Sequence, residues 1–523
     1  MANLQRQSGI LRRAWNGLFG RGGQPRPTIN KIVRQATDER AYFDAADTNR
    51  YTSNHFAAAG AADINTIIRA DITTLRKWCR YESHNNSYGR GITETLANDI
   101  VGLGPRAQVT IPDAADTTQS QRIEDAWAAW CDGCDADGRL SFGEMLNLGV
   151  KQCPASGESF QVMVSDPGAT RRQVSLRLRL IESDRVATPF DQFGTARVRD
   201  GMKFDENGRP THYIVLKRHP GDTTWLAAGN PSGYDEVPVG KMIHIYRMDR
   251  PGQNRGIPWF ATSLLPLAHL RRYTLATVTA AERAASISGI VYTTGTDIDV
   301  EEKEGFDEFE IPHDSLMTLP AGYDMRPFTP SQPTATYPGF KGEMLNEIGR
   351  GLSMPYNVVA GNSSGYNYAS GRLDWQTYFR MIRTYQAWLS RLCGKVFAAW
   401  YAEYLVTSNI VNIADIARTA WPEVNWYWPG YEHVDPVKEA NAQRIRLNSL
   451  TTTLEDEWAI KGQDYLRKLI QIAKERGLLN ELGLTLEDAA PSIIAANDAD
   501  KADDAAEAAK ENDNADTAKA EAA

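Results

Sequence analysis

The spacing of hydrophobic positions changes along the chain, and in its first half it indicates both helices and strands. Leu75, Trp78 and Cys79 recur at i, i+3 and i+4, which predicts that one face of a helix carries them. Residues 174–181 alternate between apolar and polar side chains, a pattern typical of a half-buried strand. By the same patterns we expect further helices at residues 92–100, 126–131 and 142–153, and further strands at 159–164, 212–216 and 242–246.

Longer helices and a polar interruption dominate the second half of the chain. Residues 356–371 contain Asn, Ser, Tyr and Gly but no charged side chain, and a proline-rich β and loop segment is expected at 289–338. We expect helices around these interruptions at residues 257–288, 341–352, 373–406 and 435–490. The order of elements lacks the repeated strand–helix–strand units of a doubly wound sheet, so the fold class indicated is α+β.

Charge is concentrated at the two ends of the chain. The 523 residues carry a net charge of −9, so we expect no strong overall attraction to nucleic acid. Residues 1–37 contain seven Arg or Lys and no acid, which indicates a flexible basic arm, although an organelle transit peptide has a similar composition. Residues 491–523 are rich in Ala, Asp, Glu and Lys and are expected to form an acidic disordered tail.

Cysteine use and hydropathy narrow the class of protein. Five cysteines in 523 residues are few and odd in number, which fits a reducing compartment. The chain has no apolar run near the ~20 residues that a membrane span needs. Its N-terminus also lacks the apolar core of a secretory signal. With 42% hydrophobic and 24% charged residues, the chain has enough apolar side chains for a core without disulfides.

Two short patterns resemble metal sites but lack ligands. Cys131 and Cys134 have zinc-knuckle spacing, yet a structural zinc site needs two further soft ligands, and we expect two unpaired thiols instead. The stretch from Asp135 to Glu144 partly matches a calcium-binding loop, but Gly133 stands where the first ligand would be. A glycine turn between two helices is therefore expected there, and no metal or cofactor is expected in the protein.

Sequence signatures of catalysis are also missing. The eight histidines are scattered, and the chain has no nucleophile elbow and no phosphate-binding loop. We therefore expect no enzymatic activity, with one alternative left open: a cytosolic metal-dependent hydrolase that uses the Asp and His residues of 180–250. Arg271, Arg272 and Arg283 lie on the expected helix 257–288. They are either a solvated face or, on a helix that lines a DNA channel, phosphate contacts.

Seven segments, in order along the chain, resemble the phage portal proteins of the lambda type. The strongest is the block from His244 to Gly256, which ends Arg-Pro-Gly-Gln-Asn-Arg-Gly. The others are Asn98 to Gly104, Gly157-Glu158, Leu180 to Arg185, Asp205 to Tyr213, Tyr366 to Arg372, and Asp435 to Ala440 with Gly462 to Asp464. The resemblance covers roughly residues 35–490, and Ala369 and Gly371 depart from the commonest loop sequence of the family.

The resemblance implies a homo-oligomeric ring, a dodecamer, at one vertex of the head of a tailed phage. Double-stranded DNA passes through the channel of such a ring during packaging and ejection. The ring docks the terminase large subunit and later the head–tail adaptor, and it nucleates head assembly with the scaffold or protease and the major capsid protein. The implied location is the portal vertex of the virion, with assembly in the cytoplasm of the bacterial host and no contact with a membrane.

The resemblance also implies how the segments of a portal protein map onto this sequence. The implied segments are an α/β wing at 38–256, stem helices at 257–288 and 339–355, a small β clip at 289–338, a tunnel loop at 356–372, a long helix with a return to the wing at 373–434, and a helical crown at 435–490. The loop residues expected to face DNA are Asn362, Ser363, Ser364, Tyr366, Asn367, Tyr368 and Arg372. An uncharged loop suits a channel because strong Lys or Arg contacts would hold DNA that has to slide.

Overall fold

The computed structural model describes residues 54–55, 60–111, 117–166, 168–169, 173–195, 197–222, 233–286, 289–293, 323–327, 336–408, 421–430 and 436–485. The chain divides into two units, Met1–Asp63 and Ile64–Ala523, and all the elements named here belong to the second unit. The basic arm expected at 1–37 and the acidic tail expected at 491–523 lie outside the described residues.

In the part of the chain that the structure describes, four helices precede the longest strand, and their ends follow capping rules. They are α4 (Ile64–Asn85), α5 (Ser87–Ile100), α6 (Thr117–Asp132) and α7 (Phe142–Ser156). Asn86 separates α4 from α5 because its side chain accepts a hydrogen bond from the Tyr88 backbone N–H and so caps α5. Ser141 and Glu144 form a capping box on α7, which ends at Gly157 in the left-handed region.

The apolar face predicted on α4 is only partly correct. Cys79 is fully buried and Leu75 is half-buried, as expected, but Trp78 is 52% exposed. Arg76 is buried in its place, because the carboxylate of Glu158 neutralises it. The helical spacing of apolar residues cannot predict that Arg76 is buried while Trp78 is exposed, since an arginine is assigned to the solvent-facing side.

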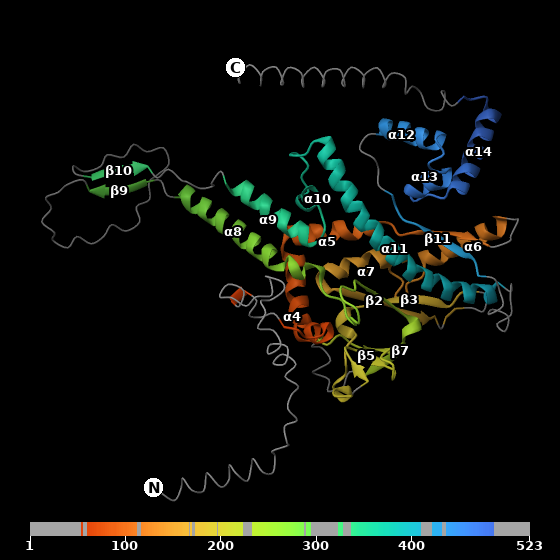
Figure 1. Cartoon of the computed structure of the whole chain (residues 1–523), viewed down its shortest axis with the longest axis horizontal. Coiled ribbons are helices and arrows are strands. Elements are labelled where there is room, and N and C mark those ends of the chain that lie inside the picture. Colours follow the sequence, from red (N-terminus) through yellow and green to blue (C-terminus); the bar gives the residue numbers. More distant parts are fainter. Residues whose placement is uncertain are drawn as a thin grey trace, which may run out of the picture. The chain divides into compact units, whose positions relative to one another are not determined.

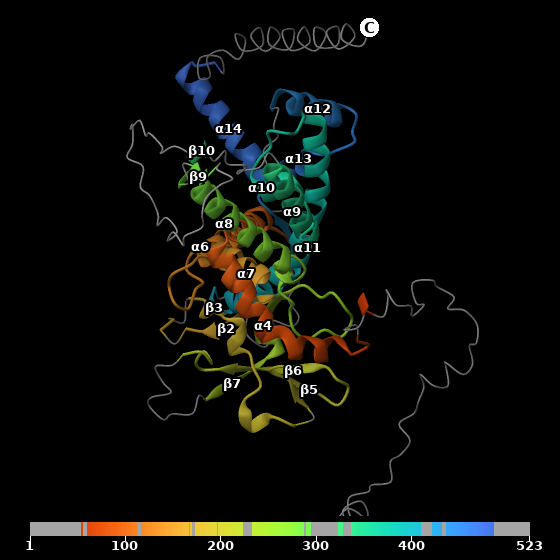
Figure 2. The same cartoon turned by 90° about the vertical axis from the view of Figure 1, so that its left-hand side faces the viewer.

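Two antiparallel sheets pack against each other where the sequence indicated mixed helix and strand. In the three-stranded sheet, β2 (Glu158–Ser165) lies between β3 (Leu176–Ile181) and β8 (Met242–Tyr246). The four-stranded sheet has the order β4 (Val198–Arg199), β5 (Met202–Phe204), β6 (Pro210–Leu216), β7 (Tyr234–Pro238). Phe160 and Ile181 share a buried cluster with Met202, Tyr213 and Val215, and Figure 2 shows the two sheets next to each other.

The larger core joins residues that are far apart in the sequence. α11 (Tyr368–Thr407), a 40-residue helix, packs aromatic side chains against α6 and α7 (Figure 1). The ring centroid of Trp127 lies 5.1 Å from that of Phe397 and 5.2 Å from that of Trp400, in edge-to-face geometry. Beyond α11, β11 (Glu423–Tyr427) pairs with β1 (Arg106–Thr110), so the chain returns to the strand that follows α5.

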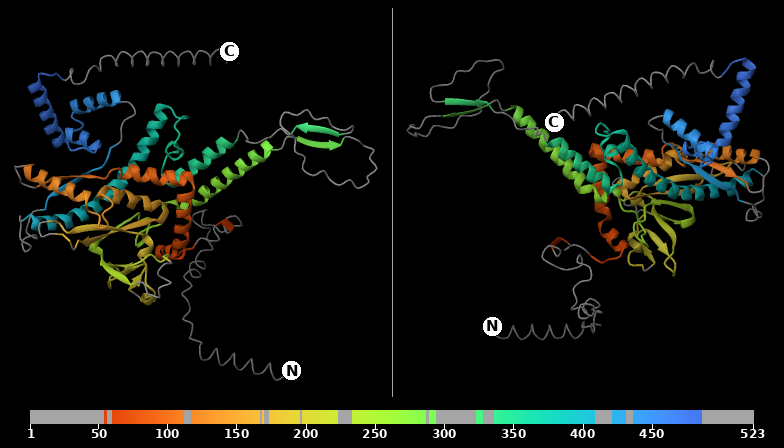
Figure 3. Two further views of the ribbon diagram at one scale, coloured as in Figure 1. Left: turned by 180° about the vertical axis from the view of Figure 1, so that it is seen from behind. Right: turned by 45° about the horizontal axis from the view of Figure 1, so that its top comes forward.

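Two helices that were expected to frame a β insert lie side by side. Figure 3 shows α8 (Leu264–Ser286) next to α9 (Tyr337–Gly351). The rings of Tyr273 and Tyr337 join the two helices, with centroids 5.7 Å apart. The segment between them contains β9 (Gly289–Thr293) and β10 (Tyr323–Pro327), which pair antiparallel. α8 begins later than the predicted residue 257, because Trp259–Thr262 form a 3₁₀ turn that buries Trp259.

The C-terminal helices are fixed to the body at one end. They are α12 (Pro436–Asn448), α13 (Leu454–Ile460) and α14 (Tyr465–Leu482), within the region predicted to be helical. The segment after β11 passes close to the end of α13, since a Cβ on Gly430 would lie 2.1 Å from the Ile460 carbonyl oxygen. Arg467 of α14 also pairs with Glu124 of α6 at 2.8 Å. These contacts tie α13 to the segment after β11 and α14 to α6.

The elements together form the α+β fold that the sequence indicated. Over the ranges that the structure describes, none of the helices is both long and apolar enough to cross a membrane.

Candidate functional site

The polar loop before α11 is shorter at both ends than expected. α10 (Tyr356–Ala360) occupies its first part and ends at Gly361, whose φ of +61° lies in the left-handed region. α11 begins at Tyr368, so only residues 361–367 remain as loop. Tyr368 and Arg372, which were expected in the loop, lie in the first turns of α11 instead. The side chain of Tyr368 is outside the described residues, and that of Arg372 is exposed.

Hydrogen bonds give this loop a defined turn. Asn362 Oδ1 accepts a hydrogen bond from the Ser364 backbone N–H at 2.9 Å, which is an Asx turn. The Ser363 carbonyl oxygen accepts one from the Tyr366 backbone N–H at 3.1 Å. Residues 362–364 are all exposed. The loop therefore presents one amide and two hydroxyl groups to solvent and no charge.

Two of the loop residues that were expected to face DNA, Asn367 and Tyr366, form hydrogen bonds within the chain. Asn367 Oδ1 accepts a hydrogen bond from the Ser370 backbone N–H at 2.8 Å, and Ser370 Oγ accepts one from the Asn367 N–H at 3.2 Å. These bonds form the capping box of α11, so the side chain of Asn367 is occupied. Partial burial and a hydrogen bond with Asp374 raise the pKa of Tyr366. The Tyr366 hydroxyl is thus held against the first turns of α11.

The three arginines considered as phosphate contacts have different surroundings. Arg271 Nη1 lies 3.8 Å from Glu82 Oε1, and its guanidinium lies 5.4 Å from the centroid of the Tyr81 ring. Arg271 therefore faces α4. Arg272 is exposed on α8, and the side chain of Arg283 is outside the described residues.

A fully buried carboxylate lies where α4, β2 and the segment before α8 meet. Glu158 is 0% exposed, and its Oε1 lies 2.5 Å from Arg76 Nη2 and 2.7 Å from Arg255 Nε. Its Oε2 accepts a hydrogen bond from the Gly256 N–H at 2.7 Å and lies 2.9 Å from His244 Nε2. Burial alone would raise the pKa of Glu158, but the charges of Arg255 and Arg76 outweigh it and hold the pKa well below its usual value.

His244 is enclosed beside this carboxylate. Its ring is stacked between those of Phe160 and Tyr246, with centroid distances of 4.3 and 3.9 Å. Burial lowers the pKa of His244, although its hydrogen bond with Glu158 acts in the opposite direction. A neutral ring satisfies both neighbours, since Nε2–H donates to Glu158 while Nδ1 accepts from the Tyr213 hydroxyl at 3.3 Å. The geometry is that of a packed core histidine.

Two glycines allow the buried cluster to form. Gly157 has a φ of +86°, and the backbone of Gly256 passes so close to it that a Cβ on Gly256 would lie 2.1 Å from the Gly157 carbonyl oxygen. This crossing places Arg255 next to Glu158. Both glycines belong to segments that carry the resemblance to portal proteins. The two segments therefore act together, since their crossing forms the buried Glu158–Arg255 pair.

One group of described residues has the spacing of metal ligands. It lies within residues 180–250, the region on which the alternative of a metal-dependent hydrolase was based. One ligand atom from each of Glu182, Asp184 and His219 lies within 4.8 Å of the others. Arg80 Nη2, however, is 2.5 Å from Asp184 Oδ2. His219 Nδ1 accepts a hydrogen bond from the Gly221 N–H at 2.9 Å, which leaves the ring proton on Nε2, facing the carboxylates. An ion-pair network explains this group better than a metal site.

The other two metal-like patterns have structural roles. All five cysteines are free, as expected for Cys131 and Cys134, and burial raises the pKa of Cys134 to about 12. Asp135 accepts hydrogen bonds from the backbone N–H groups of its own turn, including that of Arg139 at 2.9 Å. Glu144 belongs to the capping box of α7. The expected glycine turn between two helices is therefore confirmed.

The class that the sequence indicated, the portal proteins of tailed phages, fits three features of the structure. They are the α+β body, the pair α8 and α9 with a two-stranded sheet between them in the sequence, and the uncharged loop before the 40-residue helix α11. The family described as phage portal protein, lambda family, matches residues 51–386, which is more than half of the chain. The chain belongs to the lambda family of phage portal proteins. Members of this family are structural components of the phage particle.

Individual relatives carry the same description. The probable portal protein of Halomonas phage phiHAP-1 is 25% identical over 497 residues, which cover 91% of this chain and 94% of that protein. Portal protein B of Escherichia phage lambda is 22% identical over 451 residues, which cover 75% and 81%. A solved structure of the neck of a native gene transfer agent particle, computed with C12 symmetry, covers 75% of this chain and 93% of its own chain, with a TM-score of 0.44 and 15% identity.

Sequence reasoning missed the most deeply buried charges. Gly157-Glu158 and the Arg255-Gly256 end of the strongest block both stood out as family-like segments, but nothing in their order along the chain showed that they touch. Arg76 was not singled out although it lies on the face of α4 that carries Ile72 and the buried Cys79, because apolar periodicity treats an arginine as a solvent-facing residue. A search for acid–base pairs that bridge distant family-like segments could have found Glu158 and Arg255.

Proposed function

We propose that the chain assembles into a closed ring at one vertex of the phage head and that double-stranded DNA passes through the channel of this ring during packaging and ejection. The observation that carries the proposal is the exposed, uncharged turn at 361–367, held rigidly by a capped 40-residue helix. Amide and hydroxyl groups contact phosphates weakly or through water. They add no counterion-release affinity, so they guide DNA without holding it.

Exposed apolar side chains on the helix pair support self-assembly. Leu275 and Val278 of α8 are 59% and 50% exposed, and Phe340 of α9 is 48% exposed. Side chains of this kind are enriched where another protein surface covers them. In a ring, the uncovered face of one subunit meets a different face of the next, and such heterologous contacts close by rotation. A dodecamer is the ring size we propose.

The segments of the chain then have distinct roles. We assign residues 38–256 to the wing, α8 and α9 to the stem, the insert around β9 and β10 to the clip, and α12–α14 to the crown. The clip is proposed to meet the terminase large subunit and later the head–tail adaptor. The ring nucleates head assembly with the scaffold or protease and the major capsid protein, in the cytoplasm of the bacterial host. Arg372 is exposed in the first turns of α11, and we include it among the proposed DNA contacts.

Lysines in the loop test its role in the channel. Asn367 is left unchanged, because its side chain caps α11. We expect Ser363→Lys with Ser364→Lys to leave ring formation intact and to impair packaging. Two lysines from each subunit place a positive belt against phosphates, and each neutralised phosphate steepens the log–log salt dependence of binding by ~0.9. The readout is packaged DNA per head at moderate and at high salt, with negative-stain microscopy of the rings.

The matched control is Ser363→Ala with Ser364→Ala, which removes the hydroxyls and adds no charge. This variant should package nearly as well as the unchanged protein, and high salt should partly rescue the lysine variant. If the lysine variant forms rings and packages normally, the loop does not face DNA. If the unchanged protein forms no rings, the proposed function itself fails.

A further inference from the structure

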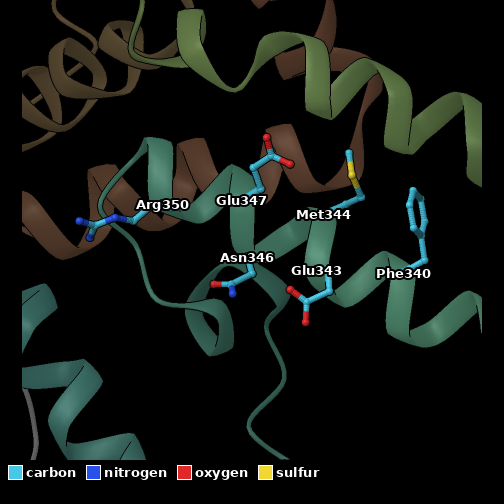
Figure 4. A pocket seen from close by; sticks show the side chains of 6 residues that line it. All are labelled: Phe340, Glu343, Met344, Asn346, Glu347 and Arg350. Atoms are coloured by element: carbon cyan, nitrogen blue, oxygen red, sulfur yellow. The ribbon is translucent and has the colours of Figure 1, made fainter. Parts of the chain in front are cut away.

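The outer face of α9 is hollowed and acidic. A cavity of about 410 Å³ lies along this helix. Figure 4 shows the side chains that line it, which are Phe340, Glu343, Met344, Asn346, Glu347 and Arg350. Leu345 and Ile348 are buried on the other side of α9, and Lys341 lies 5.3 Å from the centroid of the Tyr88 ring on α5. The hollowed face therefore points away from the core, and its Phe340 edge contacts α8 of the same chain. It carries two exposed carboxylates, Glu343 and Glu347, and one exposed cation, Arg350.

The outer face of α8 carries the complementary charge. Leu267 and Leu270 are buried, and Tyr273 and Thr274 contact Tyr337 of α9. At 3.6 residues per turn, Arg272 then lies on the side of α8 that points away from α9, and it is exposed. Leu275 is also exposed and lies less than one turn further along α8. α8 thus presents a cation beside an apolar side chain, and α9 presents carboxylates beside Phe340 and Met344.

Contacts within the helix pair place these two outer faces at the same level. The Tyr273 ring lies 4.8 Å from that of Phe340 between centroids, and the Tyr337 hydroxyl lies 3.3 Å from Thr274 Oγ1. Arg272 is therefore level with the start of α9. Glu343 is about one helical turn away from that level, at ~1.5 Å per residue, within reach of an arginine side chain. Rotation about a ring axis involves no translation along it. In a ring whose axis runs along the helix pair, groups at equal levels of neighbouring subunits can therefore meet.

We propose that the cavity on α9 receives the outer face of α8 from the neighbouring subunit, with Arg272 paired to Glu343 across the interface and Leu275 packed near Phe340. This inference rests on the proposed ring and identifies residues that join its subunits. The occupant is a second copy of this chain because its own α8 has the required charge at the required level. Arg272 then serves as a contact between subunits, and not as the phosphate contact that the sequence also suggested.

Charge reversal and its compensation test the pairing in the full-length protein. The variants are Arg272→Glu, Glu343→Arg and the double variant, and Arg209→Glu at an exposed wing position is the matched control. Native mass spectrometry and negative-stain microscopy give the fraction of chains in rings over a range of protein concentrations. Each single reversal should raise the concentration needed for rings by at least about tenfold, as expected when like charges meet at an interface. The double variant should return close to the unchanged protein, and the control should match it.

The outcomes separate this inference from the proposed function. If both single variants form rings as readily as the unchanged protein, or if the double variant is no better than the single ones, the pairing is wrong while the ring remains. Circular dichroism of each variant confirms that a loss of rings is not a loss of folding. If Arg272→Glu forms normal rings but changes the salt dependence of DNA packaging, Arg272 is a phosphate contact and the inference is overturned.

Discussion

Replacing Glu158 by Gln should be among the most destabilising single changes in the body of this portal protein. The substitution keeps the shape of the side chain and removes the charge that Arg76 and Arg255 share. Removing one partner of a buried ion pair costs about 3–5 kcal/mol, because the remaining charge is left without compensation. Asp184 Oδ1 still lies 3.4 Å from Arg76 Nη1 and offsets part of the loss. We therefore expect the lower end of that range, about 3 kcal/mol.

Thermal unfolding measures this loss directly. For a domain of about 150–250 residues, the size of the proposed wing, 1 kcal/mol corresponds to about 2–4 °C in Tm, so Glu158→Gln should lower the Tm of that domain by roughly 6–12 °C. The matched control is Glu94→Gln, whose carboxylate is 33% exposed and pairs with Arg90 and Lys151 at the surface. Loss of a pair as exposed as that one costs about 0–1 kcal/mol.

Calorimetry and tryptophan fluorescence should report the same ranking for the two variants at equal protein concentration. The reasoning is refuted if Glu158→Gln melts within about 2 °C of the unchanged protein, or if Glu94→Gln is equally damaging. Either result would mean that the buried arginines find compensation elsewhere.

Two further predictions follow from the same cluster. The free energy of unfolding should be constant between about pH 6.5 and pH 8 and fall in acid. The pKa of His244 is lowered from 6.5, so its contribution is lost as pH falls below that value, and the pKa of Glu158 is lowered from 4.5, so a larger loss follows below pH 4.5. Urea titrations at a series of pH values measure this, and a stability that rises on acidification would contradict it. Gly256→Ala should cost about 1–3 kcal/mol through the clash with the Gly157 carbonyl. Gly240→Ala, with no atom within 4 Å of the added Cβ, should be nearly neutral, and equal melting temperatures for the two alanine variants would rule out the close crossing.

Local patterns in the sequence predicted the elements whose stability is local. The strand at 242–246 has the predicted bounds, and the predicted helix at 373–406 lies within α11. The bounds failed where a side chain or a turn overrides periodicity. Asn367 starts α11 early through its capping box, and the buried Trp259 anchors a 3₁₀ turn before α8. Neither effect is visible in the spacing of apolar residues, because both depend on hydrogen bonds or burial made by single residues.

By itself, the sequence determined the fold class, the order of the elements, the uncharged character of the loop and the resemblance to portal proteins. These properties follow from composition and from spacings of a few residues, which a linear chain displays directly. Only the tertiary structure decided that Glu158 meets Arg76 and Arg255, that Arg271 faces α4 while Arg272 is exposed, and that Asn367 caps a helix. Such pairings join positions that are far apart in the chain, as Arg255 and Glu158 or Arg271 and Glu82 are, and a buried charge is tolerated only where folding brings a partner to it.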